Sequence, residues 1–280
     1  MENTYSTENA LLKMDDASFA RLSTFVTKEY GIKLPESKKM MLEGRLNKKV
    51  KTLGMTSYGQ FLDYIFSEQG KQAELFDVVD LITTNKTDFF REALHFQFLT
   101  SQFLPEYPRR NIKIWSAGCS TGEEPYTIIM ALEEYKQRHS DLSYSLLASD
   151  ISLRVIQSAY DGIYSLDRLT PIPLELRRKY FLRSKQNPTL ARVKPIYRQK
   201  IVYKRINLME DNYRLMHADY DIIFCRNVLI YFNKPTQEAV IRKFCYYLKP
   251  GGLLFLGHSE SIIGMDLPLK QLQPTVYQVQ

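Results

Sequence analysis

The segment from Gly118 to Gly122, GCSTG, combines residue types and a spacing that suit ligand binding or catalysis. It follows a short run typical of a strand, KIWSA at 113–117, and precedes a run of apolar residues with helical spacing. In an open α/β sheet, ligands bind at such turns, outside the carboxyl ends of the strands. Ser120 occupies the second glycine position of the dinucleotide-binding fingerprint, so the turn does not match that fingerprint.

The same five residues also fit the nucleophile elbow of a serine hydrolase, G-x-S-x-G, with Ser120 as the nucleophile. A catalytic triad would then need an acid and a histidine later in the chain. His258, which follows the apolar run LLFLG at 253–257, is the attractive candidate for the base. On the residues alone, a serine hydrolase built on 118–122 therefore stays open as an alternative.

A methyltransferase that uses S-adenosylmethionine explains more of the sequence than a hydrolase does. Such an enzyme needs an acid at the end of its second strand to hold the ribose hydroxyls, and Asp150 follows the strand candidate SLLAS at 145–149. It often carries a basic-Pro-Gly-Gly turn before a late strand, and LKPGG at 248–252 supplies one. The glycine turn at 118–122, the acid at 150 and the turn at 248–252 are each weak signals. They occur together, however, and in the order expected for such an enzyme.

The sequence predicts two domains, a helical domain followed by an α/β domain that carries these residues. Residues 1–84 are predicted to form a small helical domain, with Asp15 or Asp16 capping a helix that ends near Gly31. From about residue 110, strand candidates alternate with helix candidates, which predicts an α/β domain with a mainly parallel sheet. Residues 163–200 interrupt this alternation and are predicted to be an insertion with strand character at 191–199.

Composition excludes several classes of protein. The 280 residues have no apolar run long enough to cross a bilayer, which takes about 18 residues, and the first residues do not resemble a secretory signal. The chain has three cysteines and no C-x-x-C pair, which argues against a disulfide framework or a zinc cluster. We therefore expect a cytoplasmic protein.

Positive charge is concentrated in two places, although the whole chain has a net charge of only +7. Residues 154–205 contain 13 Lys and Arg against three acids, a net charge of +10. Residues 1–84 have a net charge of −1, yet 38–51 holds six positive charges and one Glu. Basic patches suit nucleic acid, anionic lipid or an acidic protein surface, and also an ordinary solvated face. A nucleic-acid methyltransferase is disfavoured, because the chain has no Pro-Pro pair of the kind found in amino-methylating enzymes.

Six segments, in order along the chain, resemble the successive motifs of the bacterial chemotaxis receptor methyltransferases, the CheR family. The resemblance runs from about Asp15 to near the end of the chain and includes the helical first part and the basic insertion. The segments are LITTNKTDFFRE (81–92), WSAGCSTGEEPY (115–126), ASDIS (148–152), INLME (206–210), IIFCRNVLIYF (222–232) and LKPGGLLFLGHSES (248–261).

The resemblance implies a Rossmann-like, S-adenosylmethionine-dependent methyltransferase domain with a small β-subdomain insertion, preceded by a small all-α domain. We accordingly expect a helical domain at 1–84, a linker that contributes to the cofactor site at 85–109, and a methyltransferase domain at 110–280 with its insertion at about 163–200. The implied reaction is the methylation of glutamates on chemoreceptor cytoplasmic helices, which leaves S-adenosylhomocysteine. We expect a monomer that needs no metal, binds no nucleic acid and does not insert into membranes.

The resemblance also assigns site residues by their places in the motifs. Arg91 and Tyr231 are expected next to the reacting groups. A non-catalytic, receptor-binding relative is disfavoured because Arg91, Asp150 and Tyr231 are all present. Gly118 stands where many family members carry alanine. The implied cofactor contacts are Asn85, Thr87, Arg91, Glu124, Asp150, Asn207, Leu208, Arg226 and Asn227. The implied substrate-docking face, on the helix that carries 38–51, consists of Arg45, Lys48, Lys49 and Lys51.

This chemistry needs no catalytic triad. A glutamate side chain has a reference pKa of about 4.3, so it is already an anion at neutral pH and attacks a sulfonium methyl group without a general base. The anion and the cation become a neutral ester and a thioether, so water, which solvates both charges, should slow the reaction. A partly dehydrated site that aligns the reacting atoms should therefore accelerate it.

Overall fold

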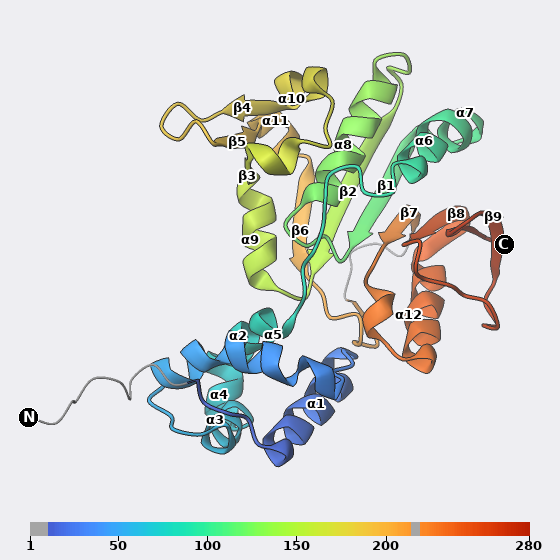
Figure 1. Ribbon diagram of the computed structural model, residues 1–280. Coiled ribbons are helices and arrows are strands. Elements are labelled where there is room, and N and C mark those ends of the chain that lie inside the picture. Colours follow the sequence, from blue (N-terminus) through green and yellow to red (C-terminus); the bar gives the residue numbers. More distant parts are fainter. Residues whose placement is uncertain (1–10, 214–218) are drawn as a thin grey trace, which may run out of the picture. The chain divides into compact units, whose positions relative to one another are not determined.

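The structure is a computed structural model that describes residues 11–213 and 219–280. The expectation that the chain begins without a secretory signal falls mainly on residues 1–10, which lie outside the described residues. The chain divides into two compact units, Met1–Thr84 and Asn85–Gln280 (Figure 1). In the described part of the chain, no helix is both long enough and apolar enough to cross a membrane.

The first unit is helical in its described residues, and its first helix begins and ends where the sequence predicts. The Asp15 side chain accepts a hydrogen bond from the main-chain nitrogen of Ser18 at 2.8 Å, and Gly31 ends the helix with a φ of 71°. Leu22 and Val26 point into the core of the unit. The helices are α1 (Asp16–Tyr30), η1 (Glu36–Lys38), α2 (Lys39–Thr52), α3 (Tyr58–Ile65), α4 (Glu68–Ala73) and α5 (Leu75–Ile82).

The second unit is built on a seven-stranded sheet with the strand order β6-β2-β1-β7-β8-β10-β9. The strands from β6 to β8 in this order run parallel, and β10 is antiparallel to both of its neighbours. The predicted α/β fold class is confirmed, although β9 was not predicted and β8 already begins at the predicted LKPGG turn. The strands are β1 (Asn111–Ala117), β2 (Ser143–Asp150), β6 (Ile201–Arg205), β7 (Tyr220–Cys225), β8 (Leu248–Leu256), β9 (Leu269–Gln273) and β10 (Val276–Val279).

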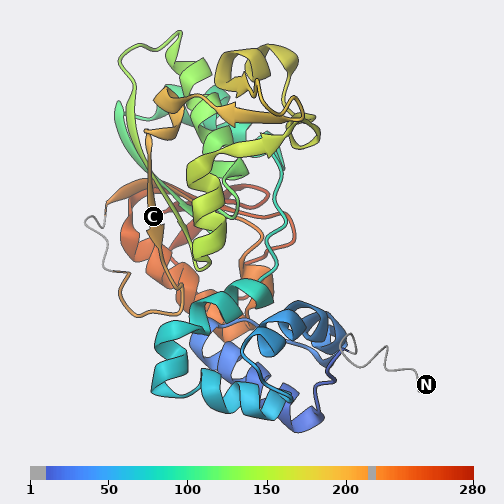
Figure 2. The same ribbon diagram turned by 90° about the vertical axis from the view of Figure 1, so that its left-hand side faces the viewer.

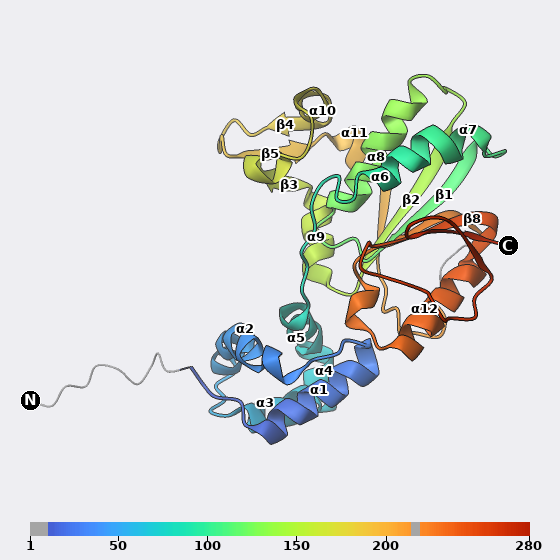
Figure 3. The ribbon, with the colours of Figure 1, turned by 45° about the vertical axis from the view of Figure 1, so that its right-hand side comes forward.

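Helices cover both faces of this sheet. Side chains of β1 alternate between two cores, with Ile112 and Ile114 in the first core and Trp115 and Ala117 in the second. Helices α6 and α8 cover the first core, and α12 covers the second on the opposite face (Figure 3). The principal helices are α6 (Leu94–Phe98), α8 (Glu123–Lys136), α9 (Leu153–Asp161) and α12 (Lys234–Tyr247), and the short η4 spans Leu229–Tyr231.

The predicted insertion forms a separate three-stranded antiparallel sheet with the order β3-β5-β4 (Figures 1 and 2). The strand predicted around 191–199 is present as β5, but it covers only the first part of that range. Strand β5 ends at Val193, and Pro195 begins the short helix α11, because proline fits the first turn of a helix but cannot donate to a strand ladder. The elements are β3 (Ile163–Ser165), η3 (Leu166–Leu169), α10 (Leu174–Tyr180), β4 (Phe181–Arg183), β5 (Leu190–Val193) and α11 (Pro195–Arg198).

Residues 85–109, expected to be a linker, form part of the second unit. They contain α6, the π-helix η2 (Leu99–Phe103) and α7 (Leu104–Glu106). Phe96 and Leu99 are buried in the first core of the sheet. The segment that leads from the first unit into the sheet is therefore held by packing against that sheet.

Asp221 is a completely buried carboxylate on β7, with 0% of its surface exposed. It accepts hydrogen bonds from the Tyr107 hydroxyl at 2.7 Å, from the main-chain nitrogen of Lys113 at 2.7 Å, and from the Lys249 ammonium at 2.8 Å. These partners come from the segment before β1, from β1 itself and from β8. The carboxylate therefore ties three neighbouring parts of the sheet together.

Replacing Asp221 with alanine should destabilise the second unit by about 3–5 kcal/mol, because the Lys249 ammonium would lose its buried partner. Asp219→Asn is a matched control, since Asp219 pairs with Lys113 at 2.8 Å but is about half exposed; its effect should stay within about 1 kcal/mol. Urea unfolding followed by the fluorescence of Trp115, the single tryptophan of the chain, measures both variants. A wild-type unfolding midpoint for Asp221→Ala would contradict this account.

Candidate cofactor and active site

The strand order places a natural ligand site at the carboxyl end of β1. Strand β2 lies on one side of β1 and β7 on the other, so the direction in which strands are added to the sheet reverses at β1. Ligands of open α/β sheets bind outside the carboxyl ends of the strands at such a reversal. The turn after β1, the end of β2 and the residues after β7 meet at this edge, and each carries residues that the sequence singles out.

Two glycines of the turn after β1 leave no space for a side chain. Gly118 has a φ of 91°, and a Cβ atom there would lie 2.3 Å from a methyl group of Val228. Gly122 has a φ of 97°, and a Cβ atom would lie 2.8 Å from Ala159 and from the Tyr164 hydroxyl. Both positions thus require glycine for conformation and for space. The result is a closely packed turn at the carboxyl end of β1.

Asp150 ends β2 and holds this turn in place. One carboxylate oxygen accepts a hydrogen bond from the main-chain nitrogen of Ser120 at 2.9 Å, and the other accepts one from Ser152 at 3.0 Å. A carboxylate offers about four acceptor positions, so Asp150 can accept several hydrogen bonds at once. The acid predicted to contact the cofactor is therefore also the acid that orients the glycine turn.

Ser120 is not arranged as a hydrolase nucleophile. Its hydroxyl donates to the main-chain oxygen of Asn85 at 3.0 Å rather than to an imidazole. The His258 ring lies 4.0 Å from a carboxylate oxygen of Glu92, measured from its Nε2. In this geometry Ser120 joins the turn to the segment that begins at Asn85, which gives the hydroxyl a structural role.

The segment that begins at Asn85 is fastened to the site at further points. Arg168, in the insertion, donates to the main-chain oxygen of Thr87 at 2.8 Å and also pairs with the buried carboxylate of Glu123. The main-chain nitrogen of Phe90 donates to the Thr127 hydroxyl on α8 at 3.1 Å. The predicted contacts Asn85 and Thr87 therefore lie beside the glycine turn. The insertion supplies one of the groups that keep them there.

Arg226, which follows β7, is an interior cation whose side chain is only 2% exposed. Its guanidinium lies 3.1 Å from a carboxylate oxygen of Glu124 and 3.0 Å from one of Glu92, and it also donates to the main-chain oxygen of Arg91. Its Nε is buried without a hydrogen-bond partner. Arg226 and Glu124, both predicted to bind the cofactor, thus contact each other.

The two carboxylates around Arg226 differ in protonation behaviour. Burial raises the pKa of Glu124, although Arg226 opposes this effect. Burial also acts to raise the pKa of Glu92, but Arg226 and the main-chain hydrogen bond from His258 lower it overall. Glu92 was not among the residues predicted from the sequence. The available signal was its position directly after Arg91 in the FFRE motif.

The other predicted residues lie at the same edge or near it. Arg91 donates from its guanidinium to the main-chain oxygen of Lys86 at 3.1 Å. Tyr231 ends η4 and is half buried against the second core. Asn207 accepts a hydrogen bond from the main-chain nitrogen of Met209 at 3.0 Å, and its neighbour Leu208 is buried in the second core.

Asn227 adopts a φ of 61°, which is uncommon for a residue other than glycine. The Glu260 carboxylate holds this backbone by accepting hydrogen bonds from the main-chain nitrogens of Asn227 at 3.0 Å and Leu229 at 2.7 Å. Burial raises the pKa of Glu260, while these hydrogen bonds act in the opposite direction. Glu260 is thus a further residue that sequence reasoning missed. It supports the chain between β7 and Tyr231.

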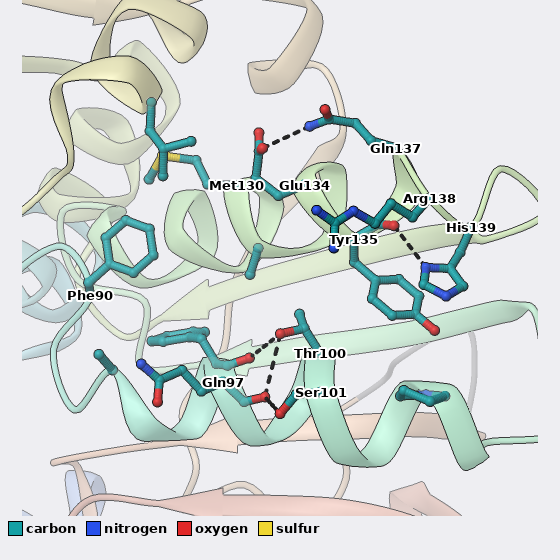
Figure 4. A pocket seen from close by; sticks show the side chains of 15 residues that line it. Phe90, Gln97, Thr100, Ser101, Met130, Glu134, Tyr135, Gln137, Arg138 and His139 are labelled. Carbon is teal, nitrogen blue, oxygen red and sulfur yellow. Dashed lines mark hydrogen bonds between the residues drawn. The ribbon is translucent and has the colours of Figure 1, made fainter.

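Two further features lie near this site. Glu92, His95 and His258 have potential metal-ligand atoms within 4.8 Å of one another, and burial lowers the pKa of His95 to about 4. The Arg226 guanidinium already contacts Glu92 in this group, so a cation bound there would face a positive charge. A cavity of about 630 Å³ lies between α6, η2 and the C-terminal half of α8 (Figure 4). None of the predicted site residues lines it.

The predicted docking face belongs to α2 of the first unit, and its four basic residues differ in their surroundings. Arg45 donates to the main-chain oxygens of Leu81, Ile82 and Thr83 and so caps the end of α5. Lys49 lies 2.7 Å from Asp77 and also pairs with Glu74. Lys48 and Lys51 are more exposed than these two. Two of the four side chains therefore stabilise their own unit.

Comparisons with known proteins agree with this geometry. Residues 85–278 match the CheR methyltransferase SAM-binding domain, and residues 17–83 match the CheR methyltransferase all-alpha domain. The two matches coincide closely with the two compact units of the structure. They confirm the family resemblance, and they give no support to a serine hydrolase.

Curated relatives match nearly the whole chain. A chemotaxis protein methyltransferase of Borreliella burgdorferi is 36% identical over 277 residues, covering 96% of each chain. Chemotaxis protein methyltransferase 2 of Pseudomonas aeruginosa is 39% identical and covers 88% of this chain and 87% of its own. The chemotaxis protein methyltransferase of Escherichia coli is 35% identical, with coverage of 95% and 92%. Since these relatives and both domain models match in order along the chain, the protein belongs to the CheR methyltransferase family.

Proposed function

We propose that this protein transfers a methyl group from S-adenosylmethionine to glutamate side chains on the cytoplasmic helices of chemoreceptors, forming glutamyl methyl esters. The observation that carries the proposal is the contact between the glycine turn and Asp150 at the carboxyl end of β1. This arrangement lies within a matched SAM-binding domain. The names of the relatives, chemotaxis protein methyltransferases, supply the chemotactic context.

The residues at the edge of the sheet fit this cofactor. Gly118 and Gly122 give the turn after β1 its conformation, and the Asp150 carboxylate, which can accept several hydrogen bonds at once, is the proposed acceptor for the ribose hydroxyls. When bound, S-adenosylmethionine supplies an electrophilic methyl group beside a positive sulfur. Asn85, Thr87, Asn207 and Leu208 complete the proposed binding surface.

Arg91 and Tyr231 are the proposed catalytic residues. The Arg91 guanidinium can bind the substrate carboxylate in a bidentate manner, and the Tyr231 hydroxyl can donate a hydrogen bond that orients it. Neither residue needs to remove a proton, because the attacking glutamate is already ionised. Their contribution is alignment and the exclusion of water from the reacting charges.

The proposed partners are acidic segments of receptor helices, approached through the exposed lysines of α2. We further propose that the enzyme acts in the cytoplasm as a monomer, without nucleic acid and without a metal ion. Arg45 and Lys49 are assigned to the stability of the first unit, since both are bonded within it. Lys48 and Lys51 are assigned to the receptor.

Replacing Asp150 with asparagine should weaken binding of S-adenosylmethionine and S-adenosylhomocysteine by about 1.5–3 kcal/mol, because a charged hydrogen-bond acceptor is lost. Titration calorimetry measures both affinities. Ser120→Ala is the control and should keep most of the cofactor affinity and of the methyl transfer. Unchanged affinity in Asp150→Asn would remove this acid from the site. Complete loss of turnover in a folded Ser120→Ala variant with normal affinity would reinstate a nucleophilic serine.

Replacing Tyr231 with phenylalanine should lower kcat much more than it lowers cofactor affinity, because the lost hydroxyl is assigned to the reacting groups. Methyl transfer to purified receptor and calorimetry with S-adenosylhomocysteine give the two quantities. If both fall by the same factor, Tyr231 is instead a cofactor-binding or packing residue.

Replacing Lys48 and Lys51 together with glutamine should raise the KM for receptor at low salt and leave the cofactor affinity unchanged. The difference from wild type should shrink as salt rises, because exposed charges are screened over about 8–10 Å at ordinary ionic strength. The matched pair Arg45→Gln and Lys49→Gln should lower the thermal stability of the first unit. Normal receptor methylation by the Lys48/Lys51 variant at low salt would show that this face is only solvated.

A further inference from the structure

The turn that carries Arg91 has an unusual backbone conformation. The residues on either side of it, Phe90 and Glu92, both have a φ of 54°, in the left-handed region that residues other than glycine rarely adopt. Such conformations cost about 1–3 kcal/mol each and persist only where the surrounding structure holds them. The contacts of this turn should therefore reveal what keeps Arg91 in place.

Glu92 makes most of these contacts through its side chain, which is only 11% exposed. One carboxylate oxygen lies 3.0 Å from the Arg226 guanidinium. The other accepts hydrogen bonds from the main-chain nitrogen of His258 at 3.2 Å and from the Asn227 side chain at 3.5 Å. Glu92 thus anchors the turn to the residues that follow β7 and β8, on the far side of the reversal point in the sheet.

Arg226 also holds this turn, through the main chain as well as through the Glu92 side chain. The same guanidinium nitrogen that contacts Glu92 also donates to the main-chain oxygen of Arg91. The second terminal nitrogen contacts Glu124, at the start of α8. Directly after the Arg91 Cα atom, the turn is therefore held by the carbonyl group of Arg91 and the carboxylate of Glu92; before it, the main-chain nitrogen of Phe90 donates to the Thr127 hydroxyl at 3.1 Å.

We propose that Glu92 is a positioning residue for the methyl-transfer site, and that it acts by holding the left-handed turn that presents the Arg91 side chain. The inference rests on the proposed function, which assigns Arg91 to the cofactor and the substrate carboxylate. The Glu92 carboxylate has its own partners within the protein and is not expected to touch either ligand. Without the Glu92 carboxylate, the turn should relax toward ordinary backbone conformations. The Arg91 side chain should then occupy several positions instead of one.

A double-mutant cycle tests this role. Glu92→Gln keeps the size of the side chain but loses its charge, and we expect S-adenosylhomocysteine to bind about tenfold more weakly, the loss of roughly one charged hydrogen bond. Arg91→Ala should weaken binding by at least as much. The double variant should bind no more weakly than Arg91→Ala, because Glu92 acts through the missing side chain. Calorimetry measures all four affinities, and thermal unfolding shows whether each variant is folded.

The matched control is Glu133→Gln on α8. Glu133 is also a largely covered glutamate, bonded to Lys200 at 2.9 Å and to Tyr144 at 2.6 Å, but it lies outside the site. This variant should keep wild-type cofactor affinity. Should Glu92→Gln fail to fold, Glu92→Asp keeps the charge but is too short to reach all the partners at once. It should show the same coupling to Arg91.

The outcomes separate this inference from the function on which it rests. If the wild type binds neither S-adenosylmethionine nor S-adenosylhomocysteine, the proposed function fails. If the wild type binds both and Glu92→Gln binds equally well, only the positioning role is overturned. It is also overturned if the effects of Glu92→Gln and Arg91→Ala multiply, because Glu92 would then act independently of Arg91.

Discussion

A buried guanidinium must be surrounded by groups that accept its hydrogen bonds, and this requirement shapes the site around Arg226. Leaving such a charge without partners in a low-dielectric interior would cost several kcal/mol. Glu92, Glu124 and the carbonyl group of Arg91 meet the requirement for the two terminal nitrogens, leaving only Nε without a partner, and they come from the segment before β1 and from α8. The burial of one cation therefore forces three separate parts of the chain to converge at the carboxyl edge of the sheet.

At the opposite end of β7, a buried anion rather than a buried cation is compensated by partners from neighbouring segments. Asp221, at the start of β7, is fully buried and is compensated by Lys249 and by hydrogen bonds from Tyr107 and Lys113. Buried ions thus fix β7 to its surroundings at both ends. Between them the strand is purely apolar, IIFC at 222–225, and fits between β1 and β8 in the middle of the sheet. This rigid strand carries Arg226, Asn227 and Tyr231 in the segment that follows it.

The basic helix α2 shows why charge in a sequence is an incomplete guide to a binding surface. Its positive residues were predicted as one face, and they share the spacing of one side of a helix. Arg45 caps α5 and Lys49 pairs with two acids, so both contribute to folding. Lys48 and Lys51 are the exposed members of the set. The distinction depends on α5, which is distant enough in sequence that no local pattern reveals the pairing.

The sequence by itself determined the features that depend on neighbouring residues. The Asp15 cap, the glycine turn at 118–122, the acid at the end of β2 and the α/β alternation could all be predicted, because each is encoded within a few positions. The motifs also placed the candidate site residues in order. Only the tertiary structure decided that Glu92 meets Arg226, which lies 134 positions away, or that residues 85–109 pack as helices on the sheet. Those contacts follow from the strand order, which sets β7 beside β1, and strand order depends on interactions between segments that are distant along the chain.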